Sequence, residues 1–394
     1  MKLRSPLAVY VIWHPDFSEG QEIANFLYSI LNRNVSKPLV RSIGIPVYFR
    51  NENESGERQP IKIDFDESEF TAIVTLVSTE LMNDSHYRKY IDSILSLCRA
   101  DNGKRRVYPV ALNNNACNVS PNFSAINFIK FDEVELARSG EKSTYIKSHI
   151  KSSILHELCR FLMHRKRATE ERESLDISPP IKLFISHSKH DPSKLDALEF
   201  RDHINSRTQL KTFFDVNDIA YGSDFGEQIK DAAIAKESAL VVFQSDSYSD
   251  REWCRIEAIT AKSAGCPIVI VNAIKYGEKR TFPYLGNCPS IRFNENFDEI
   301  IDLTLEQVLS NVFKRKFLDV LTDLYNIKGD LILSTPPELF NFIQLRKRGL
   351  AADEKYALVV YPDPPLGSEE ISILSQLDSD YFFVTPIMLP SIIM

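Results

Sequence analysis

Short apolar runs alternate with segments of helical periodicity across the middle of the chain, and this alternation constrains the fold most strongly. Helical patterns occupy 194–205, 224–238 and 251–265, the last of which ends at Gly265. The runs between them are typical of strands: KLFIS (182–186), KTFFD (211–215), ALVVFQS (239–245) and PIVIVNA (267–273). Strands that alternate with short helices form a parallel sheet with helices on both faces. The sequence therefore predicts an α/β fold.

The chain is too long for one ordinary domain, because its 394 residues exceed the roughly 100–200 that such a domain contains. The clearest break is the charged segment HRKRATEERESLDISPP, which ends in two prolines. A softer break lies near 310–330, where a long helical pattern meets LILSTPP. We predict an α/β domain at 1–165, a linker at 166–180, a second α/β domain at 181–312 and a small α/β module at 313–394.

Composition excludes several classes of protein. Hydrophobic residues make up 43% and charged residues 26%, as in globular proteins, and the net charge of −7 argues against a general nucleic-acid or anionic-membrane binder. No apolar run reaches the 18 or so residues that span a bilayer, and VYVIW near the N-terminus reads as a strand and not as a signal peptide. The six cysteines are scattered without a C-x-x-C pair. We therefore expect a reduced, cytoplasmic protein with no metal site.

Polar residues follow the first three predicted strands of the middle segment. They are Ser186–Asp191 after the first strand, Asp215–Asp224 after the second and Ser245–Asp250 after the third. Ligands of open parallel sheets bind at the carboxyl ends of the strands, so these residues should meet at one edge. Their composition suits a nucleotide or sugar site, and on this pattern alone the function stays open.

Three stretches, in order and at matching spacing, resemble the signature boxes of a TIR (Toll/interleukin-1 receptor) domain. Residues 216–224, with Gly222 in the turn, resemble the BB loop of that family. Trp253, Cys254 and Glu257 form a W-C-x-x-E pattern that resembles TIR domains with NAD-cleaving activity. The three stretches are FISHSKHD, FFDVNDIAYGSDFGEQIKDAAI and the run from SALVVFQSDSYSDREW to GCPIVIVN. The resemblance implies a flavodoxin-like TIR fold and a catalytic Glu257.

One carboxylate suits NAD⁺ cleavage, because nicotinamide leaves as a neutral molecule and needs no general acid. A glutamate that binds the ribose hydroxyls can stabilise the oxocarbenium-like charge. The resemblance thus assigns Glu257 to catalysis, with NAD⁺ as substrate and no bound cofactor. Trp253 either lines the pocket or anchors the core, and Asp215 either contributes to the pocket or caps a turn. Candidate contacts to the phosphates or adenosine are Ser186, His187 and Lys189.

The resemblance to multidomain bacterial TIR proteins implies an NAD⁺ glycohydrolase or cyclase of antiviral defence, which depletes NAD⁺ or makes an ADP-ribose-derived signal. It also implies self-association, since a neighbour's BB loop helps to close the site in related enzymes. Two alternatives remain. The domain could be a non-enzymatic adaptor or assembly module, or it could be another N-glycosyl enzyme such as a nucleoside deoxyribosyltransferase.

Residues 1–165 repeat the order of elements of the middle segment. VYVIWHPDF parallels LFISHSKHD, and aligned by hand Tyr87 falls at the place of Trp253 and Ile91 at that of Glu257. We interpret this part as a degenerate TIR-like domain without a catalytic carboxylate, or else as an unrelated flavodoxin-like domain. In either case we expect sensing, partner binding or assembly there.

The tail predicts the order β-α-β-α-β and resembles no family. Its segments are 331–335, 337–348, 356–367, 368–377 and 381–386. We expect it to dock on its neighbour or to bind a trigger or partner.

Overall fold

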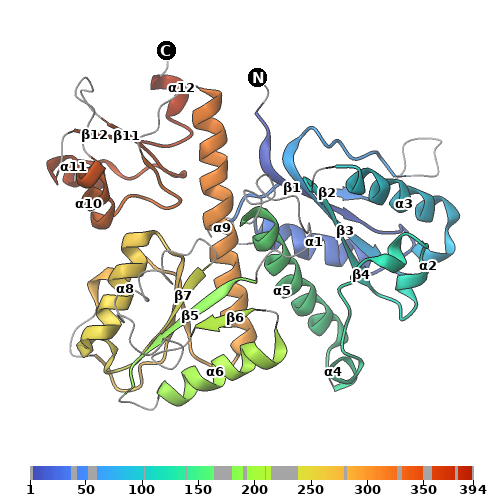
Figure 1. Cartoon of the computed structure of the whole chain (residues 1–394), viewed down its shortest axis with the longest axis horizontal. Helices are drawn as coiled ribbons and strands as arrows, with labels where there is room; N and C mark the ends of the chain where they lie inside the picture. Colours follow the sequence, from blue (N-terminus) through green and yellow to red (C-terminus); the bar gives the residue numbers. More distant parts are fainter. Residues whose placement is uncertain are drawn as a thin grey trace. The chain divides into compact units, whose positions relative to one another are not determined.

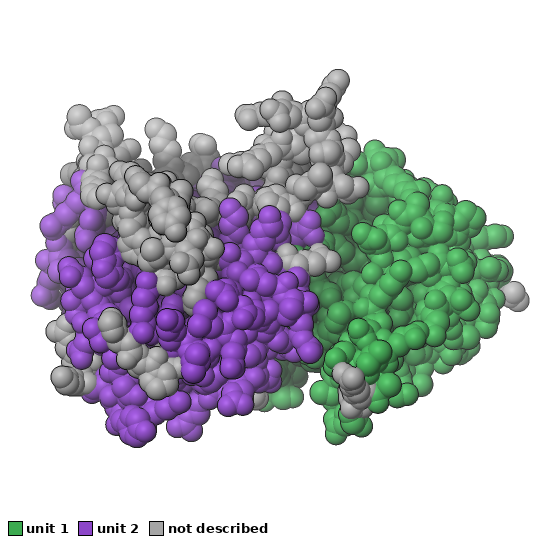
Figure 2. Space-filling model, turned by 60° about the horizontal axis from the view of Figure 1, so that its bottom comes forward, with its two compact units in different colours: residues 1–158 green, residues 159–394 purple. Residues whose placement is uncertain are grey.

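A computed structural model describes most of the chain, in two compact units that Figure 2 colours separately, residues 1–158 and 159–394. Each unit is described by itself. The described residues are 3–36, 42–51, 60–101, 103–138, 140–163, 180–189, 193–208, 210–213, 238–278, 282–325, 331–348, 357–377 and 380–392.

The first unit contains a parallel sheet in the order β2-β1-β3-β4 (Figure 1). Its strands are β1 (Ser5–Ile12), β2 (Val47–Arg50), β3 (Ser68–Val77) and β4 (Arg105–Ala111). Its helices are α1 (Gly20–Leu31), α2 (Thr79–Asn83), α3 (Ser85–Arg99), α4 (Glu133–Arg138) and α5 (Lys142–Met163), the last of which continues into the second unit.

Helix α3 covers one face of this first sheet, because its apolar stripe packs on alternate residues of the strands. Tyr90 and Ile94 of α3 belong to one buried cluster with Tyr10 and Ile12 of β1 and Ile73 of β3. β1 and β3 are buried along nearly their whole length, as expected for strands covered on both faces.

The second unit contains a five-stranded parallel sheet in the order β6-β5-β7-β8-β9. In order along the chain this is 2-1-3-4-5, the flavodoxin-like order, so the predicted α/β fold with a flavodoxin-like parallel sheet is confirmed. The strands are β5 (Lys182–His187), β6 (Lys211–Phe213), β7 (Ser238–Gln244), β8 (Ile268–Asn272) and β9 (Ser290–Arg292). Strand β9 was not predicted, because its three residues contain no apolar run.

Helices lie on both faces of this sheet (Figure 1): α6 (Ser193–Arg207), α8 (Glu252–Ala264) and α9 (Phe297–Leu324). Ala258 and Ala261 of α8 pack on Leu240 and Val242 of β7. Phe243 points to the opposite face, where its ring lies 5.5 Å from that of Phe200 on α6. The predicted end of α8 at Gly265 is confirmed by that residue's left-handed φ of 69°.

A third, smaller parallel sheet has the order β10-β11-β12. Its strands are β10 (Leu331–Ile332), β11 (Ala357–Val360) and β12 (Tyr381–Val384), and its helices are α10 (Leu339–Arg348), α11 (Ser368–Leu377) and α12 (Leu389–Ile392). The predicted order of elements in the tail is therefore present.

The long helix α9 packs against both sheets of the second unit. Leu318 and Leu321, near its end, pack on Val360 of β11 and Val384 of β12, whereas Phe297 at its start contacts Phe200 of α6. The division of the chain into 1–165, 166–180, 181–312 and 313–394 stays a proposal, with residues 313–324 continuing α9.

Several sequence predictions lie outside the described residues: the linker up to residue 179, the BB-like loop at 216–224 with Gly222, and nearly all of the helix at 224–238. In the part of the chain that the structure describes, no helix combines the length and the apolarity that crossing a bilayer requires.

Candidate functional site

The site lies where β5 and β7 end and α8 begins. Ser186 is the penultimate residue of β5, and Glu257 is in the second turn of α8. The Ser186 hydroxyl donates a hydrogen bond to Oε2 of Glu257, although the two residues are 71 positions apart. The structure thus joins two residues that the sequence singled out, one from a strand end and one from a helix.

A third side chain, Tyr248, completes this contact. It stands in a 3₁₀ turn, Tyr248–Asp250, and is 0% exposed. Its hydroxyl lies 2.7 Å from Oγ of Ser186 and 3.3 Å from the backbone oxygen of Cys254. Burial raises the pKa of Tyr248 well above its ordinary value, so the phenol keeps its proton.

No sequence motif singles out Tyr248. A tyrosine within the polar run SDSYSD has the local pattern of an exposed loop residue. The available signal was a single aromatic residue among small polar ones directly after a buried strand.

Two further contacts join the end of β5 and the residue after it to the segment that runs from the end of β7 into α8. The hydroxyls of Ser188 and Ser247 lie 2.7 Å apart, and Sγ of Cys254 lies 3.5 Å from the backbone oxygen of His187. His187 is buried, whereas Lys189 is exposed. The carboxyl end of β5 is therefore fixed to the segment that carries Glu257.

Trp253 lies one helical turn before Glu257 and is 54% exposed. That exposure excludes the role of core anchor, which was one of the two expected from sequence. Asp215, the remaining predicted site residue, lies outside the described residues.

The loop after β8 is tied to the loop after β7 by two carboxylates. Asp246 accepts hydrogen bonds from the backbone N–H groups of Lys275, Tyr276 and Gly277. Desolvation would raise the pKa of Asp246, but these donors lower it. Glu278 accepts from Gln244 at 2.9 Å and from Ser249 at 2.6 Å. These hydrogen bonds thus fix the two loops to each other at this edge of the sheet.

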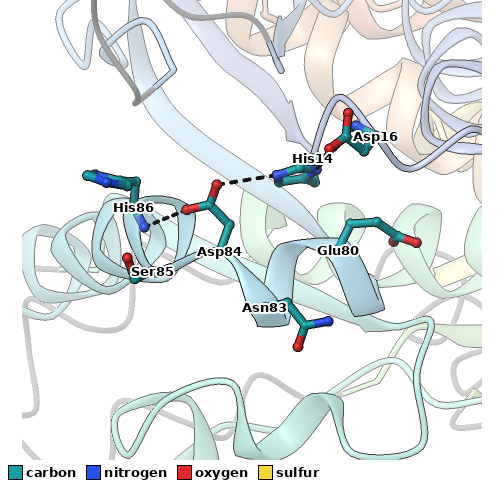
Figure 3. Close-up of a pocket in the computed structure, with 7 residues that line it drawn as sticks. All are labelled: His14, Asp16, Glu80, Asn83, Asp84, Ser85 and His86. Carbon is teal, nitrogen blue, oxygen red and sulfur yellow. Dashed lines mark hydrogen bonds and ion pairs between the residues drawn. The ribbon is translucent and has the colours of Figure 1, made fainter.

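The corresponding edge of the first unit has different chemistry. An open hollow of about 470 Å³ is lined by His14, Asp16, Glu80, Asn83, Asp84, Ser85 and His86 (Figure 3). Nε2 of His14 lies 3.5 Å from Asp84 Oδ2, and Nδ1 accepts from the backbone of Asp16.

Counted from its first residue, the sixth position of α3 is Tyr90, whereas the sixth position of α8 is Glu257. Ile91, the residue expected from sequence at the place of Glu257, comes next. Both Tyr90 and Ile91 are buried. With either alignment, α3 presents no carboxylate at the place of Glu257.

No metal centre is suggested by the described residues, among which no group of three or more His, Cys, Asp or Glu side chains is placed to hold an ion.

Comparison with known proteins identifies one segment. A family model of the TIR domain matches residues 183–305, which span the second sheet from β5 to β9 and the first part of α9. Residues 183–305 therefore carry a TIR domain. No curated protein sequence matches the chain.

Similarities to solved structures are weak. The TIR domains of the activated Roq1 resistosome, which directly recognizes the pathogen effector XopQ, are 15% identical over 36% of this chain and 99% of that chain, with a TM-score of 0.22. The C-terminal domain of glucosamine-fructose-6-phosphate aminotransferase from Francisella tularensis is 9% identical over 78% of this chain and 83% of that chain, with a TM-score of 0.20. At such TM-scores neither similarity carries an argument about this chain.

Proposed function

We propose that the TIR domain cleaves the nicotinamide–ribose bond of NAD⁺, with Glu257 as the catalytic residue. The observation that carries the proposal is the hydrogen bond from Ser186 to Glu257, which holds a carboxylate at the ligand-binding edge of a flavodoxin-like sheet. The TIR family match supports it, because some TIR domains cleave NAD⁺.

The reaction asks for little beyond this carboxylate. The bond between ribose C1′ and the nicotinamide nitrogen breaks, and its electron pair leaves with nicotinamide, which becomes neutral. Glu257 accepts hydrogen bonds from the ribose hydroxyls and stabilises the positive charge that develops on the sugar. Water, or a nucleophilic atom of the same molecule, then bonds to C1′ and loses a proton, which yields ADP-ribose or a cyclic isomer.

Other residues bind the rest of the substrate. The exposed indole of Trp253 stacks on a flat ring of NAD⁺, and Lys189 supplies a positive charge for the phosphates. We assign His187 and Asp215 to the same pocket on the resemblance alone. NAD⁺ is the substrate, and the proposal needs no further cofactor.

The biological setting is also a proposal. We infer a role in antiviral defence, in the cytoplasm, with activity switched on by self-association of TIR domains. We interpret the first unit, whose strand order 2-1-3-4 is common to TIR and other flavodoxin-like sheets, as a degenerate TIR-like domain. That unit and the C-terminal module are the proposed sites for a trigger or partner.

The second candidate function is a non-enzymatic TIR assembly module, and Glu257 separates the two. We would measure NAD⁺ consumption and separate the products, at high protein concentration with a crowding agent. The variants are Glu257→Gln, which keeps shape and removes charge, and Glu252→Gln, a matched control at an exposed position of the same helix. We expect a loss of about 100–1,000-fold for Glu257→Gln and wild-type activity for Glu252→Gln.

Equal activity of Glu257→Gln and wild type would contradict the site assignment. An inactive wild-type protein that still assembles would favour the assembly module.

A further inference from the structure

We propose that Tyr248 is a positioning residue for Glu257: its hydroxyl donates to Ser186, which in turn donates to Glu257. We call these three side chains the Glu257 network. The inference rests on the proposed function and gives Ser186 a different task from the one expected from sequence, because the hydroxyl orients the carboxylate and does not bind the NAD⁺ phosphates.

The direction of the hydrogen bonds follows from counting protons. A serine hydroxyl has one proton, and that of Ser186 is donated to Oε2 of Glu257. In the 2.7 Å contact between Ser186 and Tyr248, Tyr248 must therefore be the donor. The alternative acceptor for Tyr248, the backbone oxygen of Cys254, lies farther away at 3.3 Å.

Burial keeps the Tyr248 phenol protonated, so that it can act as the donor. The side chain is enclosed by the core cluster that joins α8 to the sheet, with Leu240, Val242 and Cys254 among its members. Desolvation, followed by the nearby Cys254 and Glu257, raises the pKa of the phenol. Tyr248 thus stays a donor over the whole physiological pH range.

The geometry also explains why a serine at a strand end needs a buried tyrosine. A hydroxyl proton rotates to suit its partners, and a donor that occupies the oxygen restricts that rotation. With Tyr248 donating to its oxygen, the Ser186 proton remains directed at Glu257. A carboxylate held in this way is already oriented before the substrate arrives, and pre-orientation lowers the barrier of the chemical step.

The experiment compares kcat and KM for NAD⁺ in full-length wild type, Tyr248→Phe, Ser186→Ala and the double variant. Tyr248→Phe removes one oxygen and keeps the ring. We expect kcat to fall about 10- to 100-fold in both single variants, with KM within about twofold of wild type. The double variant should be no slower than Ser186→Ala, because both substitutions break the same network.

The control is Tyr361→Phe, which removes the hydroxyl of another fully buried tyrosine of the second unit, one that accepts a hydrogen bond from the backbone N–H of Leu366. Its kcat should equal that of wild type. The thermal unfolding midpoint of every variant shows whether a reduced kcat comes from unfolding of the protein or from a misoriented Glu257.

Three results would overturn the proposal. They are a kcat of Tyr248→Phe within twofold of wild type, additive losses in the double variant, and a raised KM with unchanged kcat in Ser186→Ala. A raised KM with unchanged kcat in Ser186→Ala would assign Ser186 to substrate binding. If Tyr248→Phe does not fold, the kcat and KM of Ser186→Ala alone test the proposal. An inactive wild-type protein would overturn the proposed function and this inference together, whereas an active wild type with an unimpaired Tyr248→Phe overturns only the inference.

Discussion

The two tryptophans of the chain occupy opposite environments. Trp13, just after β1, is 1% exposed and packs edge-on against Phe49, with ring centroids 5.4 Å apart. Trp253 is 54% exposed on the first turn of α8. An indole exposed to this extent contributes little to stability, and under the proposed function its role is to contact the substrate.

We therefore expect opposite outcomes from alanine substitution at the two positions. Trp13→Ala should lower the free energy of unfolding by about 3–5 kcal/mol, because it leaves a cavity. Trp253→Ala should lower it by less than about 1 kcal/mol and raise KM for NAD⁺ about 10-fold. Urea unfolding and initial-rate kinetics check the two halves. Wild-type KM in Trp253→Ala would remove this residue from the pocket.

Single residues of the site differ in how far sequence could identify them. Ser186 and Glu257 were singled out because they stand at the end of an apolar run and in a recognisable helix motif. Tyr248 is harder to identify, because the small polar residues around it are typical of an exposed loop, and its position after a buried strand is the one local sign of burial. The serine and the tyrosine are 62 positions apart, and only folding brings them into contact.

At the scale of elements, α3 and α8 occupy equivalent places in their sheets but begin differently. Asp84 caps α3, since its Oδ1 accepts from the backbone N–H of His86 at 2.6 Å and of Tyr87 at 3.3 Å. Helix α8 follows Arg251, whose side chain makes no cap. The first turn of α8 is held instead by Cys254, whose Sγ lies 3.5 Å from the backbone oxygen of His187, and by Arg255, whose guanidinium donates to the backbone oxygen of Ser249 at 3.1 Å.

Replacing Asp84 should therefore weaken the first unit. We expect Asp84→Ala to cost about 1 kcal/mol at pH 7 and Asp84→Asn to retain most of the cap. Desolvation alone would raise the pKa of Asp84, but the backbone donors His86 and Tyr87 lower it below 3.8. A lowered pKa means that the ionised form stabilises the folded state.

That contribution is present above pH 3.8 and is lost as pH falls through the folded pKa. The difference between wild type and Asp84→Asn, measured by urea unfolding, should accordingly shrink below about pH 3.8. A difference that grows on acidification would contradict this account of the cap.

At the scale of the whole molecule, the C-terminal module contacts α8, the helix that carries Glu257. Nζ of Lys262, on α8, lies 2.8 and 2.7 Å from the two carboxylate oxygens of Glu338, just before α10. These side chains are only 11% and 24% exposed. The rings of Tyr284 and Phe340 also pack together, with centroids 5.2 Å apart. Within the second unit, the third sheet and the TIR sheet are thus connected by these side-chain contacts as well as by helix α9.

Removing one member of this ion pair should be costly. Glu338→Gln leaves a mostly buried ammonium group without its counter-charge, and we expect a loss of about 1–3 kcal/mol in urea unfolding. The double variant Lys262→Met with Glu338→Leu should recover much of that loss, because it removes both charges. Wild-type stability of Glu338→Gln would show that the pair contributes nothing.

The sequence by itself determined the α/β class, nearly all the described strands, the end of α8 at Gly265 and the TIR segment. These features depend on periodicity and motifs that lie within short stretches of chain. The tertiary structure decided the strand order 2-1-3-4-5, the presence of β9, the exposure of Trp253 and the burial of Tyr248. Each of these depends on contacts between residues tens of positions apart, and local patterns carry no information about which distant partner will cover a side chain.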